Sequence, residues 1–479
     1  MESRNISRIQ EEVFMKKVSI VRSIVCAACV TLELIGFSVV AQSKPRKISL
    51  RKAVECAPRS GLPNFFAKCE KGGTVKVAYL GGSITKQAGW RIQSLDLLRN
   101  MYPKVNFEEI NAAMGGTGSN IGVFRLESDV LEKKPDLLFV EFGVNDSAIK
   151  KSLIPRSMEG IVRNTWKVLP ECEICFVYTL TTQGLKLLKN GKFNVPVTLH
   201  EEIAEHYGIP TIHMGMEVAR LEKEEKLLMK APNAKVKQVA GKELDRISGI
   251  QINSDGKIPF SRDGVHPYLD TGHKLYTDAI ERSLPLIKTA STKPSSHSNL
   301  APPLSDYVKS VSFYPVEKAQ MKGSWEKLEN LKKIFKRKNL TEQLSCLWKA
   351  EPGAELSFKF KGRSFMLYSL SGPGTGLIEV TIDGQASEKH NNFDDYCSYW
   401  RISPYFPATD LSPKNIHKAI IKVLPDKIDK RTMLMRLRPK AYDKNPDAFK
   451  PTNFFIGGIY IEGEMLNGAG VPVKDQSCF

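Results

Sequence analysis

The central part of the chain alternates short apolar runs with amphipathic stretches, and this rhythm constrains the fold more than any other feature. Apolar runs of strand length occur at 75–80, 105–110, 137–142, 174–179 and 209–212. The stretches between them have apolar residues near a 3.6-residue period, at 90–100, 121–132, 154–168 and 199–207. Strands that alternate with helices form parallel sheets covered by helices. The sequence therefore predicts a three-layer α/β/α domain with a parallel sheet over residues 71–290.

A change of period marks a second domain. Segment 291–304 is rich in Ser and Pro, a composition typical of linkers. Beyond it, apolar and polar residues alternate, as at Phe358 and Phe360 and again over 378–382. Because this part has no parallel-sheet rhythm, 305–470 is predicted to form an antiparallel β-sandwich of jelly-roll type.

The N-terminus has the pattern of a targeting segment. Lys16-Lys17 precedes an apolar stretch at 18–40, and small residues follow at a plausible cleavage point. We interpret 1–41 as a signal peptide; a retained membrane anchor is the alternative, because the stretch is nearly long enough to span a bilayer. The chain is expected to be secreted or periplasmic, with no stable membrane span after cleavage. The remaining parts are an N-terminal extension and a C-terminal tail, at 42–70 and 471–479.

The charge balance is strongly basic. Among 479 residues, 70 Lys and Arg face 52 Asp and Glu, which gives a formal charge of +18 and requires that a polyanionic partner be considered. Nucleic acid is not expected, since the chain combines a secretory leader with no nucleic-acid-binding motif. Basic runs such as 427–440 are interpreted as solvated faces, and contact with an acidic glycan is the alternative.

The cysteines give little sign of a metal or redox site. Cleavage after residue 41 leaves an odd number of the nine cysteines, so at least one thiol stays free or pairs between chains. Cys56 and Cys69 either bridge in an oxidising compartment or stay reduced. The pair Cys172-x-x-Cys175 has no second CxxC or His pair nearby and lies in an apolar run, so we predict that it packs within a strand. No metal and no cofactor are expected.

Polar and glycine-rich segments follow the ends of several predicted strands. Open parallel sheets bind ligands beyond the carboxyl ends of their strands, so these segments are the candidates for a site. The segments are Gly81-Gly82-Ser83-Ile84-Thr85, 111–118, Gly143-Val144-Asn145-Asp146 and, before the last helix of the domain, Asp263-Gly264-Val265-His266-Pro267.

Together these segments supply the groups that acyl transfer requires. Ser83 is the candidate nucleophile, His266 the base and Asp263 the carboxylate that orients the imidazole. The Ser83 and Gly116 amides and the Asn145 side chain are suitable donors for an oxyanion hole. Each segment alone also fits a glycine turn or a helix cap, and the spacing matches neither a dinucleotide fingerprint nor a P-loop. Their joint placement on one rim of the sheet favours catalysis.

With these residues in order, the first domain resembles the SGNH (GDSL-like) hydrolase superfamily over about residues 60–290. Ser83 lies in its first block, Gly116 in the second, Asn145 in the third, and Asp263 with His266 in the fifth. The first block reads Gly-Gly-Ser-Ile instead of Gly-Asp-Ser-Leu, which resembles the secreted carbohydrate-esterase branches more than the lipases. The resemblance implies a metal-independent esterase.

A secreted domain of this kind joined to a sandwich resembles enzymes that deacetylate polysaccharides. The resemblance implies a serine esterase that acts through an acyl-enzyme on an acetylated poly- or oligosaccharide, which is either neutral or acidic. The alternatives are a carbohydrate O-acetyltransferase with the same site and a non-catalytic glycan-binding protein. In the sandwich, Tyr396, Trp400 and Tyr405 are predicted to be core residues, and a sugar-stacking platform is the alternative.

Overall fold

The structure, a computed structural model, describes residues 48–473 except for 235–251, 254, 336–339, 341–342, 345 and 436–438. The predicted signal peptide at 1–41 lies outside these residues. The described residues from Leu50 onward form one compact unit. In the part of the chain that is described, no helix is long and apolar enough to cross a membrane.

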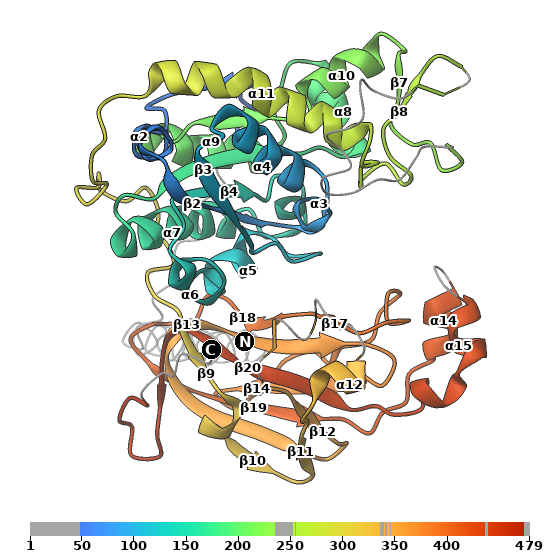
Figure 1. Ribbon diagram of the computed structural model, residues 1–479. Helices are drawn as coiled ribbons and strands as arrows, with labels where there is room; N and C mark the ends of the chain where they lie inside the picture. The colour runs from blue at the N-terminus through green and yellow to red at the C-terminus, as the bar shows by residue number, and fades with distance from the viewer. Residues whose placement is uncertain are drawn as a thin grey trace, which may run out of the picture. The chain divides into compact units, whose positions relative to one another are not determined.

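A six-stranded sheet forms the centre of the first domain, with strand order β1-β6-β5-β4-β2-β3 (Figure 1). The strands are β1 Cys56–Ala57, β2 Gly73–Gly81, β3 Val105–Asn111, β4 Leu137–Glu141, β5 Glu173–Tyr178 and β6 Thr211–His213. Strands β2 to β6 pair in parallel and correspond to the strands predicted from the sequence. The short β1 pairs antiparallel with β6 at one edge and was not predicted, because two residues carry no periodic signal.

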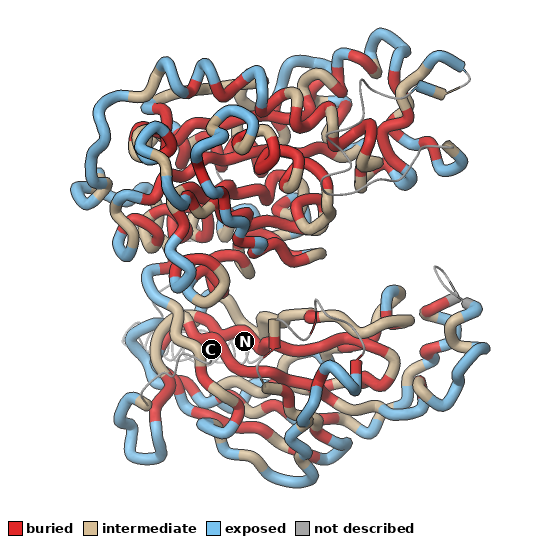
Figure 2. Tube along the Cα trace, viewed as in Figure 1, coloured by how far each residue is buried: buried red, intermediate tan, exposed pale blue. Residues whose placement is uncertain are grey.

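Helices surround this sheet. They are α2 Pro63–Lys71, α4 Trp90–Met101, α7 Leu153–Val168, α8 Thr182–Lys189, α9 Val195–Tyr207, α10 Met216–Lys223 and α11 Gly272–Ala290. Strands β4 and β5 are buried along their whole length, as expected for a sheet covered on both faces (Figure 2). The ring of Tyr79 stacks on Phe139 with centroids 5.4 Å apart and meets Trp90 edge-on, which packs α4 onto the sheet.

The single helix expected at 121–132 is wrong in detail. The segment divides into α5 Ser119–Phe124, α6 Leu126–Asp129 and a 3-10 turn at Leu131–Lys133. Arg125 stands at the first break with its side chain almost fully buried, where it donates to the carbonyl of Ala112 and pairs with Asp129. A buried guanidinium needs such partners, because an unpaired charge is costly to bury.

Three cysteines of the first domain, Cys56, Cys69 and Cys175, are free thiols. Cys175 is fully buried in β5, and burial raises the pKa of its thiol, so the prediction that it packs within a strand is confirmed. Cys56 and Cys69 are both free thiols, in β1 and α2. The alternative of a disulfide between them is therefore wrong for this structure.

The second domain is built around one long antiparallel strand, β13 Glu355–Ser371. It pairs with β20 Phe454–Leu466 and β19 Ile416–Val423, and β14 Leu377–Ile382 continues the sheet. The alternation at Phe358 and Phe360 is thus part of a longer strand, which continues through a register shift between Gly362 and Ser364. The remaining strands are β9 Ser312–Tyr314, β10 Gln320–Lys322, β11 Trp325–Lys327, β12 Trp348–Ala350, β15 Gln385–Ala386, β16 His390–Asn391, β17 Arg401–Ile402 and β18 Tyr405–Ala408.

The antiparallel β-sandwich predicted for this region is confirmed. Its twelve-stranded sheet encloses an apolar core to which the alternating residues contribute, so that Phe358 and Phe360 are buried and Lys359 is exposed. Short helices accompany the strands, namely α12 Leu331–Phe335, α14 Lys430–Met435 and α15 Pro439–Lys444.

The segment predicted as a linker is docked onto the first domain. The ring of His297 stacks on Trp166 with centroids 4.3 Å apart. Glu159, fully buried in α7, accepts hydrogen bonds from the backbone N–H groups of Leu304 and Ser305, both at 2.7 Å. Buried carboxylates need such donors, so these contacts fix the path of the chain between the two domains.

Candidate active site

Ser83 begins the short helix α3 Ser83–Lys86, immediately after β2 ends. Two glycines make this tight turn possible. A Cβ atom on Gly81 would lie 2.6 Å from Thr85 Oγ1, and one on Gly82 would lie 2.1 Å from Asn145 Oδ1. Neither space accepts a side chain, so Gly-Gly is required for Ser83 and Asn145 to approach each other.

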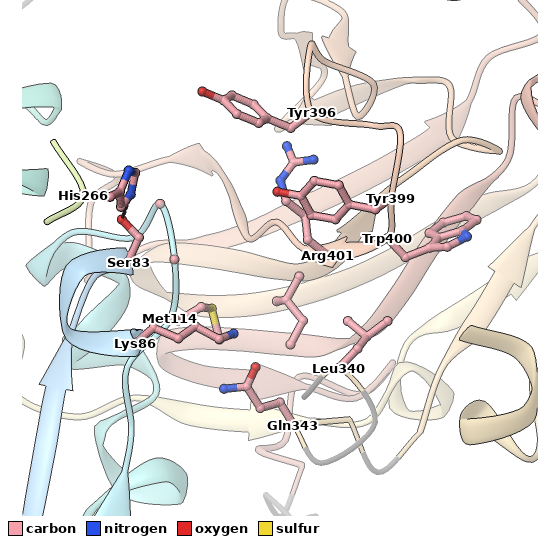
Figure 3. Close-up of a pocket in the computed structure, with 13 residues that line it drawn as sticks. Ser83, Lys86, Met114, His266, Leu340, Gln343, Tyr396, Tyr399, Trp400 and Arg401 are labelled. Atoms are coloured by element: carbon pink, nitrogen blue, oxygen red, sulfur yellow. Dashed lines mark hydrogen bonds between the residues drawn. The ribbon is translucent and has the colours of Figure 1, made fainter. Parts of the chain in front are cut away.

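The three residues predicted to form a triad are in hydrogen-bond contact. The Oγ of Ser83 lies 2.8 Å from Nε2 of His266, and a dashed line marks this hydrogen bond in Figure 3. Nδ1 of His266 lies 2.8 Å from Oδ2 of Asp263. Because a carboxylate only accepts hydrogen bonds, Nδ1 carries the proton and Nε2 faces the serine hydroxyl as an acceptor. This arrangement is the one in which an imidazole can take the hydroxyl proton.

Local geometry keeps Asp263 ionised. Its other oxygen, Oδ1, accepts from the backbone N–H groups of Val265 at 2.9 Å and His266 at 2.8 Å. Burial raises the pKa of the Asp263 carboxyl, but the hydrogen bonds from the His266 ring and from these two amides outweigh it and hold the pKa below its usual range. A carboxylate in this state can stabilise an imidazolium next to it.

Gly116 and Asn145 flank the serine from two other loops. Gly116 has a positive φ of 78°, which favours glycine, and nothing lies within 4 Å of its Cβ position, so its backbone faces open space. A Cβ on the preceding Gly115 would stand 3.6 Å from Ser83 Cβ. Asn145 starts the 3-10 turn Asn145–Ala148, and its amide lies against Gly82. All five residues predicted from the sequence therefore lie around one point.

A cavity of about 420 Å³ opens over Ser83 and His266. Its opposite wall comes from the sandwich, where segment 396–402 turns Tyr396, Tyr399 and Arg401 toward the cavity (Figure 3). Since both domains line it, the sandwich contributes directly to the surroundings of the serine.

The aromatic residues singled out in the sequence divide between two environments. Tyr396 is 52% exposed and lines the cavity, so its prediction as a core residue is wrong. Trp400 also lines the cavity, supported by Phe335 and Phe455 at ring distances of 5.2 and 4.7 Å. Tyr405 is half-buried outside the cavity lining and stacks on His390 with centroids 3.6 Å apart.

Sequence reasoning missed several residues of the cavity wall. Lys86, Gln343, Tyr399 and Arg401 line it but belong to none of the candidate segments, and Met114 lies in segment 111–118 but was given no role. Of these residues, only Lys86 and Met114 could have been suspected from the sequence, because they lie close to Ser83 and Gly116 along the chain. Among the described residues, no group of three His, Cys, Asp or Glu side chains is arranged to hold a metal ion.

The buried histidines near the site allow a pH prediction. Burial lowers the pKa of His273 to about 3, and His273 accepts a hydrogen bond from the Trp90 N–H through Nδ1. A group with this pKa is neutral throughout the range in which enzymes are usually assayed. We therefore expect the substitution His273→Gln to leave the pH dependence of kcat/KM unchanged, because a group that stays neutral cannot contribute to it.

The measurement is a pH–rate profile of both proteins on a small acetyl ester. Equal melting temperatures would show that the Gln amide replaces the acceptor for Trp90. A pH profile that changes in the variant would show that His273 gains or loses a proton in the assay range and would contradict its assignment as a neutral group.

The fold is shared with known structures. Two solved structures of a two-domain esterase (CEX) active on acetylated mannans are similar to this chain, one of them co-crystallised with mannopentaose. The mannopentaose complex has 18% sequence identity and a TM-score of 0.60 over 90% of this chain and 100% of that one; for the other the values are 18%, 0.59, 88% and 98%. At this identity the comparison establishes the fold. It confirms the predicted fold class, an α/β domain followed by a β-sandwich.

Similarity at the level of sequence covers a smaller part of the chain than the similarity of fold. No family model matches it. An uncharacterized lipoprotein, YqeF, of Bacillus subtilis (strain 168) is 33% identical over 97 residues, which are 19% of this chain and 40% of that protein. The chain thus spans about two fifths of the length of this curated relative.

Proposed function

We propose that this protein is a serine esterase that removes acetyl groups from a carbohydrate. The observation that carries the proposal is the chain of hydrogen bonds Ser83–His266–Asp263, each 2.8 Å long, at the carboxyl end of a parallel sheet and open to a cavity. This set of groups activates a hydroxyl for attack on an ester carbonyl. The likeness of fold to a two-domain esterase supports the same class of reaction.

The proposed reaction has two stages. Ser83 Oγ attacks the acetyl carbonyl carbon while His266 Nε2 takes the hydroxyl proton. Negative charge on the carbonyl oxygen is stabilised by the amides of Ser83 and Gly116 and by the Asn145 side chain. His266 returns the proton to the sugar oxygen as the C–O bond breaks, which leaves an acetyl-enzyme. Water attacks it with the help of His266, and acetate and free Ser83 result.

The substrate class is supported by the wall of the cavity. Tyr396, Tyr399 and Trp400 present aromatic rings beside the serine, and such rings pack against the apolar faces of sugars. The similar esterase acts on acetylated mannans, which makes an acetylated poly- or oligosaccharide the proposed substrate here as well. Neutral and acidic glycans are both within this proposal.

The domain boundaries and location are part of the same proposal. Helix α11 ends at Ala290 and the first strand of the sandwich begins at Ser312, which supports domains at 71–290 and 305–470 joined by 291–304. The sequence pattern at 1–41 supports secretion or the periplasm. A relative described as a lipoprotein also favours an envelope or extracellular location.

The test is to incubate the purified full chain with acetylated mannan and acetylated xylan, with and without an added acceptor sugar. Free acetate and acetate transferred to the acceptor are both measured. We expect free acetate to account for the acetyl groups lost from the polymer. Acetate found mainly on the acceptor would identify an O-acetyltransferase. Binding of polymer with no loss of acetyl groups would identify a glycan-binding protein.

A further inference from the structure

A fully buried carboxylate and imidazole lie behind the site and outside the cavity lining. Asp146 follows Asn145 directly, and His200 comes from helix α9. Their side chains are both 0% exposed, with Asp146 Oδ2 2.8 Å from His200 Nε2. Burying two polar groups away from water costs free energy, so we expect a pair buried in this way to have a role that offsets the cost. The proposed reaction gives neither residue a role.

Asp146 also holds the loop that contains Gly116. Its second oxygen, Oδ1, accepts from the backbone N–H of Ser119 at 2.7 Å, at the first residue of α5. A Cβ on Gly118 would come within 2.7 Å of the same oxygen, so the loop backbone packs directly on the carboxylate. One side chain thus connects the turn of Asn145 to the loop of Gly116.

His200 fixes the carboxylate from the opposite side. Because Asp146 only accepts, Nε2 of His200 carries the proton. Among the described residues Nδ1 has no hydrogen-bond partner, as suits the unprotonated nitrogen of a neutral imidazole. The rings of Phe176 and Tyr178 contact the imidazole and restrict its orientation. The carboxylate is therefore held by donors from two elements at once.

We propose that the Asp146–His200 pair is a positioning device for the oxyanion hole, which sets the distance between the Gly116 amide and the Asn145 side chain. This inference rests on the proposed function, because an oxyanion forms only if Ser83 attacks an ester. Oxyanion donors act at about 2.7–3.1 Å from the developing charge, and a misplacement of about 1 Å can lower the rate by about 10²-fold. Neither Asp146 nor His200 touches the substrate.

The substitution Asp146→Asn tests the pair with little change of shape. The new carboxamide can still accept from Ser119 through its oxygen, but its NH₂ group faces Nε2 of His200. Either two donors then meet, or the imidazole moves its proton to Nδ1, which has no acceptor among the described residues. We expect kcat on a small acetyl ester to fall about 10- to 100-fold with KM nearly unchanged, because the lost interaction acts only in the transition state.

The double variant Asp146→Asn with His200→Gln supplies the rescue. The Gln carbonyl can accept from the Asn NH₂ group, which restores a donor–acceptor pair in the same place. Its kcat should exceed that of Asp146→Asn alone, a coupling that independent sites do not show. Glu159→Gln is the matched control, because Glu159 is another buried carboxylate that accepts from two backbone amides. It should lower the melting temperature and leave kcat unchanged.

Hydrogen exchange gives a readout that does not depend on catalysis. Amides of segments 115–119 and 143–146 should exchange faster in Asp146→Asn than in the unsubstituted protein, and slower again in the double variant. Unchanged exchange, or a fall in melting temperature with full kcat, would overturn the inference and leave the pair a structural role. If the unsubstituted protein hydrolyses no acetyl ester, the proposed function fails, and exchange still decides whether the pair fixes the two loops.

Discussion

Substitution of Ser83 by alanine is expected to lower kcat for acetyl-ester hydrolysis by about 10⁴- to 10⁶-fold, since the acyl-enzyme can no longer form. The fold should be unaffected, because the Ser83 side chain is only half-buried and its Oγ bonds to His266 at the edge of a cavity. The measurement is release of a chromogenic alcohol from a small acetate, together with thermal unfolding.

Ser147 provides the matched control. It lies in the same 3-10 turn as Asn145 but is exposed, so Ser147→Ala should keep full activity. If Ser83→Ala also retained activity, the hydroxyl would not be the nucleophile and the proposed mechanism would be wrong.

The other two triad residues should rank in a defined order. His266→Ala removes the base and should cost nearly as much as loss of the nucleophile. Asp263→Asn keeps the base but loses the carboxylate that fixes its tautomer, so its effect should be smaller than that of His266→Ala. In the proposed mechanism the three residues act as one unit, so combining either substitution with Ser83→Ala should add little further loss.

The sequence predicted the site better than its surroundings, for a physical reason. Ser83, Gly116 and Asn145 each follow a strand whose apolar run is easy to recognise, and parallel strands end at one edge of the sheet. Their convergence follows from topology alone. His266 comes from a loop before α11, and its motif with Asp263 three residues earlier made the local contact predictable.

The cavity wall could not be predicted in the same way. Tyr396 and Tyr399 lie more than 300 residues beyond Ser83 in a loop of the sandwich, and no periodicity relates the two. Whether an aromatic residue in such a loop joins a core or a cavity depends on the tertiary packing around it. Tyr405 stacks on His390, whereas the Tyr396 ring meets only the guanidinium of Arg401 among the described ring and cation contacts and keeps half its surface exposed.

Substitutions of the aromatic residues in the cavity wall should have the second large effect on activity. Replacing Tyr396 by alanine should lower kcat/KM on an acetylated polysaccharide by up to about tenfold, since one aromatic contact contributes about 0.5–1.5 kcal/mol. Trp400→Ala should act in the same direction and more strongly, because the larger ring is held in place by Phe335 and Phe455. Activity on a small chromogenic acetate should change little in both variants, because that ester has no sugar units to contact the aromatic rings.

Point substitutions test this wall more cleanly than removal of the sandwich. Cutting the chain near Ser296 would remove the sandwich wall of the cavity. It would also remove the backbone N–H groups of Leu304 and Ser305 that donate to buried Glu159, so stability and substrate recognition would change together. Tyr396→Phe retains the ring and should retain polymer activity. Tyr102→Ala removes a ring at the far end of the sheet, beside Lys288, and should have no effect on either substrate. Equal losses on polymer and small ester in Tyr396→Ala would mean that the wall shapes the catalytic centre itself, and the sugar-contact role would have to be abandoned.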